Sequence, residues 1–191
     1  MFILYAVLIG LLLGVLLGGR ITALASIDFR WPWLAIGGFL VQVILFSDAV
    51  RAVIGDFGPP LYVGSTAAVL LAVVRNVRIP GMALVALGAA SNLAAIVANG
   101  GFMPASEAAL AALGGGLNPG YTNSTIVADP ALEPLTDLYA LPAWLPLANV
   151  FSVGDVLIGV GVVVVIVIGM RSGRRPARTL PVMSRDEADS V

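Results

Sequence analysis

The chain has no cysteine, no histidine and no lysine, and charged residues make up only 11% of its 191 positions. All ten of its basic residues are therefore arginines. These absences exclude an imidazole base, a thiolate nucleophile, a Schiff-base lysine and a metal site built from His and Cys. Disulfides are excluded as well, and a net charge of −1 argues against a nucleic-acid partner. The sequence predicts no catalytic residue, no metal site and no cofactor.

What the chain has in abundance is apolar side chains. Hydrophobic residues make up 59% of it, and the mean hydropathy is +1.01. Because so few polar side chains remain to face water, this composition predicts an integral membrane protein. The apolar runs are long enough to predict an all-α fold with about five transmembrane helices. Their expected bounds are residues 2–19, 31–48, 59–75, 81–98 and 151–170.

The arginines gather on one side of this predicted topology. In a five-helix chain, the connections after the first and third helices and the segment after the fifth lie on the same side. Nine of the ten arginines fall there, and only Arg51 falls on the other side. Because cytoplasmic loops are enriched in positive charge, we expect the N-terminus outside and the C-terminus in the cytoplasm. Residues 1–171 then form the membrane domain, and the Arg-rich tail, 172–191, is expected to be disordered.

The first apolar run could also be a signal peptide, because Ala23 and Ala25 have the spacing of a signal-peptidase site. No basic residue precedes the run, and its removal would place the Arg-rich segments outside. We therefore expect the first run to remain as a permanent span.

Small residues at four-residue spacing mark two predicted helices. Gly10, Gly14 and Gly18 share one face of the first helix, where they let another backbone approach closely. A second set with the same spacing lies in the fourth helix: Ala90, Ala94 and Ala98. We interpret both sets as packing seams within the bundle. A homodimer contact through the first helix is the alternative.

A few polar residues fall inside or next to the predicted spans. Asn92 and Gln42 need partners at membrane depth, so we expect both to face the bundle interior in hydrogen bonds between helices. A polar ligand pocket or a permeation path is the alternative. The candidate residues for such a pocket are Asp155, Ser152, Asn92, Gln42, Asp48 and Asn99.

The segment SVGD opens the fifth predicted span and has two interpretations. Ser152 and Asp155 have the spacing of a capping box, with Asp in place of the usual Glu or Gln, and a carboxylate here faces the positive end of the helix dipole. We therefore interpret Asp155 mainly as a helix cap. Alternatively, Asp155 could share a proton with Asp48, which the topology places at the end of the second span on the same side. SVGD matches only part of the GxGD motif of intramembrane aspartyl proteases.

An outer loop of about 50 residues, 99–150, separates the fourth and fifth spans. Its first residues, NGG at 99–101, are expected to end the fourth helix. Ser106 is expected to cap a short surface helix that runs through Leu113. The segment 135–150 contains two prolines that prevent an unbroken span, so it should approach the fifth helix as an extended, interfacial or re-entrant segment.

The motifs NGGFMPAS and LPLANVFSVGD, with a glycine-rich first span and two tryptophans opening the second, resemble a family of small bacterial multi-pass membrane proteins. That family is classed only as a domain of unknown function. The resemblance covers about residues 1–171. It implies a protein of the bacterial cytoplasmic membrane and supplies no reaction, substrate, cofactor or catalytic residue.

The function predicted from these features is that of a non-enzymatic membrane protein. It would act as an envelope accessory subunit, or as a binder of lipid or another small apolar ligand. One alternative is a small oligomeric transporter or channel that works through Gln42, Asn92 and Asp155. Another is an enzyme similar to the intramembrane aspartyl proteases. The expected partners are the lipid bilayer and either another membrane protein or a second copy of the chain.

Overall fold

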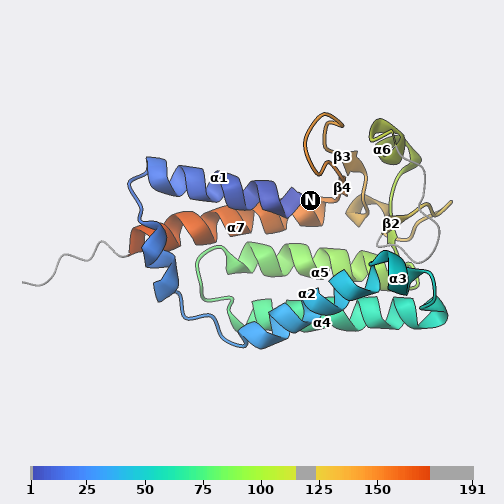
Figure 1. Cartoon of the computed structure of the whole chain (residues 1–191), viewed down its shortest axis with the longest axis horizontal. Coiled ribbons are helices and arrows are strands. Elements are labelled where there is room, and N and C mark those ends of the chain that lie inside the picture. The colour runs from blue at the N-terminus through green and yellow to red at the C-terminus, as the bar shows by residue number, and fades with distance from the viewer. Residues whose placement is uncertain (1, 115–123, 173–191) are drawn as a thin grey trace, which may run out of the picture.

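The computed structural model describes residues 2–114 and 124–172, and the described part is mostly helical. Five long helices dominate it and run back and forth in alternating directions (Figure 1). Their bounds are α1 (Phe2–Leu16), α2 (Pro32–Leu45), α4 (Gly58–Arg75), α5 (Met82–Ala98) and α7 (Val153–Ser172). The predicted tail lies outside the described residues except for Ser172, which ends α7.

The long helices pack as a row in the order α1, α7, α5, α4, α2. α7 lies between α1 and α5, and α4 lies between α5 and α2 (Figure 1). α1 and α7, the first and last helices of the described residues, are therefore neighbours, and they run in the same direction. They are also tied at one end, where the rings of Phe2 and Phe151 stack with centroids 4.7 Å apart.

Two of the helices are long and apolar enough to cross a membrane: α4 with the turn before it, Gly55–Arg75, and α7. The other three are apolar but shorter, with 15, 14 and 17 residues in α1, α2 and α5. At 1.5 Å per residue they are about 21 to 26 Å long. The expected second span, 31–48, is divided, because α2 ends at Leu45 and a separate short helix, α3 (Asp48–Arg51), follows.

The two ends of the bundle differ. We call one the loop end, formed by residues 46–57, 99–114 and 124–151, and the other the arginine end, formed by residues 17–31, 76–81 and the end of α7 (Figure 1). The arginine end carries Arg20, Arg30, Arg75, Arg78 and Arg171 and a 3₁₀ helix, η1 (Ile21–Ser26). The remaining elements lie at the loop end: η2 (Gly55–Phe57), β1 (Met103–Pro104), α6 (Glu107–Ala112), β2 (Ser124–Thr125), η3 (Glu133–Leu135), β3 (Tyr139–Ala140) and β4 (Val150–Phe151).

The long loop folds into short elements that begin and end at local signals. α5 stops at Ala98, and Gly100 and Gly101 then adopt positive φ angles of 69° and 89°. Ser106 caps α6, because its Oγ accepts a hydrogen bond from the backbone N–H of Ala109 at 3.1 Å. Both features agree with the sequence prediction. The two-residue strands do not, because an all-α fold was expected: β1 pairs with β2 in parallel, and β3 pairs with β4 in antiparallel.

Gly10 and Gly14 of α1 face α7. A Cβ atom at Gly14 would lie 2.3 Å from Sδ of Met170, and one at Gly10 would lie 3.2 Å from the Ile166 side chain. These two glycines therefore form a seam within the bundle. Gly18 does not belong to it, because α1 has already ended and Gly18 lies in a turn with φ of 73°.

The seam predicted on α5 is wrong, because Ala90, Ala94 and Ala98 are exposed. α5 packs on α7 through a different set of small residues. A Cβ atom at Gly88 would lie 2.3 Å from the carbonyl oxygen of Gly154, and one at Gly81 would lie 2.5 Å from that of Gly161. The alanines do have four-residue spacing, but the residues that face α7 are Gly88 in the helix and Gly81 just before it.

Candidate functional site

Ser152 and Asp155 form a capping box at the start of α7. The Oγ atom of Ser152 accepts a hydrogen bond from the backbone N–H of Asp155, and the backbone N–H of Ser152 donates one to Oδ2 of Asp155, both at 3.1 Å. This is the reciprocal pattern predicted from the spacing of the two residues. It satisfies two backbone donors that the first turn of a helix would otherwise leave unpaired.

Asn92 extends this cap into a cluster shared by two helices. Its Nδ2 donates to Oδ1 of Asp155, and its Oδ1 accepts from the Ser152 hydroxyl, both at 2.9 Å. We call Asn92, Ser152 and Asp155 the polar cluster. Ser152 is completely buried, and Asn92 and Asp155 are half-buried. Side-chain hydrogen bonds therefore join the middle of α5 to the first turn of α7.

Two glycines let the helices come close enough for these bonds. The backbones of α5 and α7 approach at Gly88 and Gly154, where a Cβ atom on either residue would lie within 3 Å of the other's carbonyl oxygen. A Cβ atom at Gly154 would also lie 1.9 Å from Oδ1 of Asn92. The glycine in SVGD is therefore required by the amide that bridges the helices.

Asp137, which the sequence did not single out, brings a second carboxyl group close to the polar cluster. Only 5% of it is exposed, and its backbone bonds to β1 and the start of α6 through Pro104 and Ser106. Burial is the main reason that the pKa of Asp137 is raised to about 7. The negative charge of Asp155 raises it further, while a hydrogen bond from the Ser124 hydroxyl at 3.0 Å acts in the opposite direction.

The acidic neighbour of Asp155 is therefore Asp137, and the structure does not support the alternative pairing with Asp48. Asp48 begins α3 instead of ending α2, and its side chain is exposed. α5 and α4 lie between α7 and α2 in the row of helices (Figure 1). The only signal for Asp137 in the sequence is an acid in the largely apolar segment LTDLYA, which does not identify the group that it will approach.

Gln42 and Asn99 lie elsewhere and bind the protein itself. Nε2 of Gln42 donates to the hydroxyl of Thr66 at 3.2 Å, which links α2 to α4 as expected for an inter-helix hydrogen bond. Asn99 forms a reciprocal pair with the backbone of Ala131, at 2.8 and 2.9 Å, and so fastens the end of α5 to the loop. Of the six predicted pocket residues, the structure thus brings together Asn92, Ser152 and Asp155.

The polar cluster is arranged to hold structure together. Both carboxylate oxygens of Asp155 already accept hydrogen bonds, as do Oδ1 of Asn92 and Oγ of Ser152. In residues 2–114 and 124–172, no group of three or more His, Cys, Asp or Glu side chains is placed to hold a metal ion. The cluster can fix the position of α5 against α7. The carboxylate of Asp155 also interacts electrostatically with Asp137 in the loop beside it.

Residues 26–167 match a family of unknown function, DUF5317. The matched range begins in η1 and ends within α7, so it contains the polar cluster and Asp137 but leaves out α1. No curated protein and no solved structure matches the chain.

Proposed function

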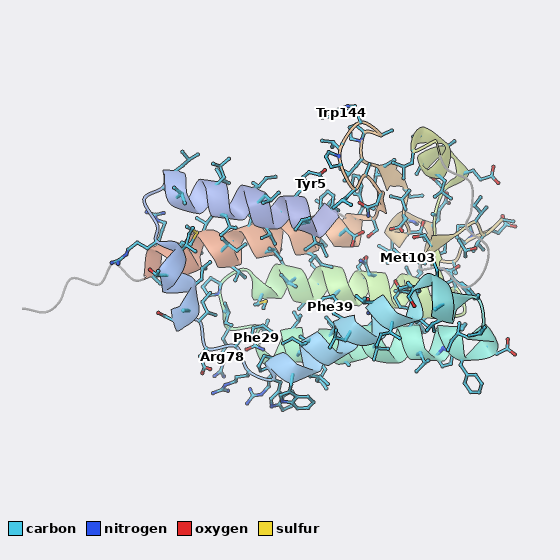
Figure 2. All side chains as sticks on the ribbon, in the orientation of Figure 1. Tyr5, Phe29, Phe39, Arg78, Met103 and Trp144 are labelled. Carbon is cyan, nitrogen blue, oxygen red and sulfur yellow. The ribbon has the colours of Figure 1, made fainter. Side chains whose placement is uncertain are left out.

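The chain belongs to DUF5317, a family of unknown function, and we propose that it is a five-span protein of the bacterial cytoplasmic membrane with a non-enzymatic binding role. The proposed spans are α1, α2, α4, α5 and α7. Large apolar side chains face outward from these helices, which suits contact with lipid chains. Phe39 on α2 is an example, with 52% of its surface exposed (Figure 2).

The proposed orientation places the arginine end in the cytoplasm and the loop end outside. It is supported by the alternating directions of the five helices and by the five described arginines at the arginine end. The N-terminus then lies outside and the C-terminus inside.

The observation that favours binding over transport is that the candidate pocket side chains Asn92, Ser152, Asp155 and Gln42 already bond within the protein. Asn92, Ser152 and Asp155 form a closed set of hydrogen bonds between α5 and α7, whereas Gln42 bonds to Thr66 between α2 and α4. These two groups lie on different helix pairs. The proposed role is therefore to bind a lipid or a membrane-protein partner, as an accessory subunit of the cell envelope.

One observation favours a second candidate, a small oligomeric transporter. Asp137 and Asp155 lie close enough to interact electrostatically at the loop end. Two carboxyl groups from different segments could bind a cation or a proton that is exchanged with the outside. A transporter predicts that Asp155→Asn gives a stable protein that has lost its cellular phenotype.

Topology is tested by single cysteines in this cysteine-free chain. Glu107→Cys lies on α6 at the loop end and Ser172→Cys lies at the end of α7, and both positions are exposed. On intact cells, a membrane-impermeant maleimide should label position 107 and not position 172. The opposite labelling pattern would reverse the orientation. Purification in mild detergent followed by native mass spectrometry should then show a retained lipid or protein partner.

A further inference from the structure

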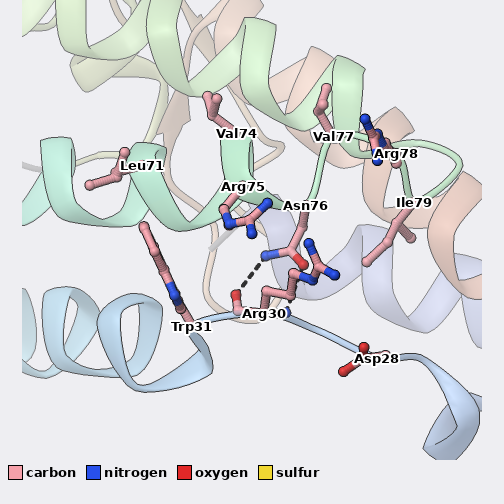
Figure 3. Close-up of a pocket in the computed structure, with 10 residues that line it drawn as sticks. All are labelled: Asp28, Arg30, Trp31, Leu71, Val74, Arg75, Asn76, Val77, Arg78 and Ile79. Carbon is pink, nitrogen blue, oxygen red and sulfur yellow. Dashed lines mark hydrogen bonds between the residues drawn. The ribbon is translucent and has the colours of Figure 1, made fainter.

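A hollow of about 510 Å³ opens at the arginine end and collects three guanidinium groups (Figure 3). We call it the arginine hollow. Arg30 and Trp31 reach it from the segment before α2, and Arg75 and Arg78 reach it from the end of α4 and the turn that follows. Segments that lie more than forty residues apart in the sequence therefore contribute to one site.

Asn76 holds the two segments together at the centre of the arginine hollow. It is 3% exposed, and its Oδ1 accepts the backbone N–H of Arg30 at 2.7 Å. Its Nδ2 donates to the carbonyl oxygens of Arg30 and Ala72, each at 2.7 Å. Figure 3 shows Arg30 and Arg75 close to this amide, so both side chains extend from backbone that a buried residue fixes.

Trp31 forms one wall and also positions an arginine. Its backbone adopts a left-handed conformation with φ of 57°. The centroid of its ring lies 5.6 Å from Cζ of Arg75, within reach of a cation–π interaction. This contact restrains the Arg75 side chain without neutralising its charge.

The charge of the arginine hollow is unbalanced. Asp28 is the one carboxylate in the lining, against three arginines. Within the part of the chain that the structure describes, none of these arginines forms an ion pair with a carboxylate. Positive charge anywhere at this end would be enough to set the membrane topology, and Arg20 and Arg171 supply it from outside the hollow. Topology therefore does not require arginines to share one space. Convergence of three arginines on one space is a separate feature.

We propose that the arginine hollow binds a phosphate group, carried either by a phospholipid head group or by a small phosphorylated solute. Guanidinium groups present paired N–H donors that match phosphate oxygens, and several of them can share one anion. The volume is in the range of small-ligand sites. Exposed Leu71 and Val74 line the hollow and continue onto the apolar surface of α4, where a lipid's glycerol and chains would lie. Basic pockets between membrane helices on the cytoplasmic side bind anionic head groups.

The inference rests on the proposed function, because it gives the binding role a ligand class and a place. Its test uses the full-length protein in detergent. In one arm, native mass spectrometry measures the affinity for phosphatidylglycerol, with phosphatidylcholine as the lipid of zero net charge. In the other arm, calorimetry measures the affinity for inorganic phosphate. Binding in the first arm alone identifies a lipid head group, and binding in the second identifies a soluble phosphate; either result supports the site.

Variants then assign the binding to the arginine hollow. Arg75→Gln combined with Arg78→Gln should weaken the observed binding by about tenfold or more. The matched control Arg20→Gln lies at the same end, outside the hollow, and should change the affinity less than about twofold. Asp28→Asn should strengthen binding, because it removes the carboxylate that competes with the anion. A loss of folding cannot produce that gain.

Equal weakening by the control and the double variant would overturn the proposal, as would the absence of binding in both arms. The two levels of inference fail separately. Maleimide labelling that puts the arginine end outside refutes the orientation, while the affinity of the hollow is measured in detergent and is unaffected. Correct labelling together with arginine-independent lipid binding refutes only the phosphate site.

Discussion

Replacing Asn92 by aspartate should destabilise the protein more than replacing Asp155 by asparagine, and combining the two changes should restore much of the loss. The reason is the direction of the hydrogen bonds in the polar cluster. Asn92 is the donor to Asp155 and the acceptor from Ser152. An aspartate at position 92 keeps the second bond but turns the first into a contact between two acceptors.

The size of each effect follows from these contacts. Asn92→Asp loses a hydrogen bond to a charged group, about 1.5 to 3 kcal/mol. It also places two carboxylates close together, which adds up to about 4 kcal/mol at an effective dielectric constant near 20. Asp155→Asn keeps one acceptor oxygen for either Asn92 or the backbone N–H of Ser152, so it should cost only about 1 to 2 kcal/mol.

We call the double variant Asn92→Asp/Asp155→Asn the exchanged protein. In it, the amide at position 155 donates a hydrogen bond to the carboxylate at position 92. That carboxylate still accepts from the Ser152 hydroxyl, and the amide oxygen at 155 accepts from the backbone N–H of Ser152. Each of the hydrogen bonds now present has a counterpart. The exchanged protein should therefore be more stable than Asn92→Asp alone by about 3 kcal/mol or more, because the repulsion is gone.

Thermal unfolding of the purified protein in detergent, followed by circular dichroism, measures the order. A difference of 3 kcal/mol corresponds to roughly 6 to 12 °C in Tm for a chain of this size. Gln42→Glu is the matched control, because it adds an acid to a helix where the partner is the Thr66 hydroxyl and not a carboxylate. An exchanged protein no more stable than Asn92→Asp would refute the hydrogen-bond assignment.

Three further predictions concern the seams and the loop. Gly154→Ala should lower stability by about 2 to 4 kcal/mol, because the new Cβ atom displaces the Asn92 amide; Gly64→Ala, where a Cβ atom meets nothing within 4 Å, should be neutral or stabilising, and equal Tm losses for the two would contradict the seam. Gly14→Leu should lower the Tm of the monomer through its clash with Met170, with Gly37→Leu as control; light scattering that instead shows a dimer dissociating at unchanged monomer stability would make α1 an oligomer face. The pKa of Asp137 is raised from 3.8 to about 7, so the folded state retains a proton that the unfolded state releases. The contribution of Asp137 to the free energy of unfolding should be complete below about pH 4 and should fall by about 4 kcal/mol as the pH rises to about 7. Chemical unfolding at several pH values measures this dependence. The variant Asp137→Asn should lack it, and an unchanged pH dependence in the variant would assign it to other groups.

Local signals in the sequence account well for where the helices and caps lie. The capping box of SVGD, the serine cap of α6 and the glycines that end α5 all act within a few residues of their own position. Such features depend on neighbouring backbone atoms, so a sequence can reveal them without knowledge of the fold.

Contacts between distant segments could not be obtained in the same way. The spacing of Ala90, Ala94 and Ala98 marked one face of α5, but only packing decides that Gly88 faces α7 instead. Asp137 was missed because its burial results from strands and loops that meet around it. The positions of the arginines along the chain predict only which side of the membrane they lie on. They do not predict the arginine hollow, because it forms where Asn76 joins two segments that lie 46 positions apart.

The pairing of α1 with α7 also fixes the order in which the molecule can be assembled during translation. The Tyr5 hydroxyl donates to the carbonyl oxygen of Pro146, 141 positions later in the chain. At roughly 5 to 20 residues per second, a ribosome needs about 7 to 28 s to make that stretch. Throughout this interval the glycine face of α1 has no α7 to cover it, whereas α2, α4 and α5 are completed within it and can pack against one another before it ends. The first helix made is thus among the last to find its place, and a chain stalled before Val153 would leave it unpartnered.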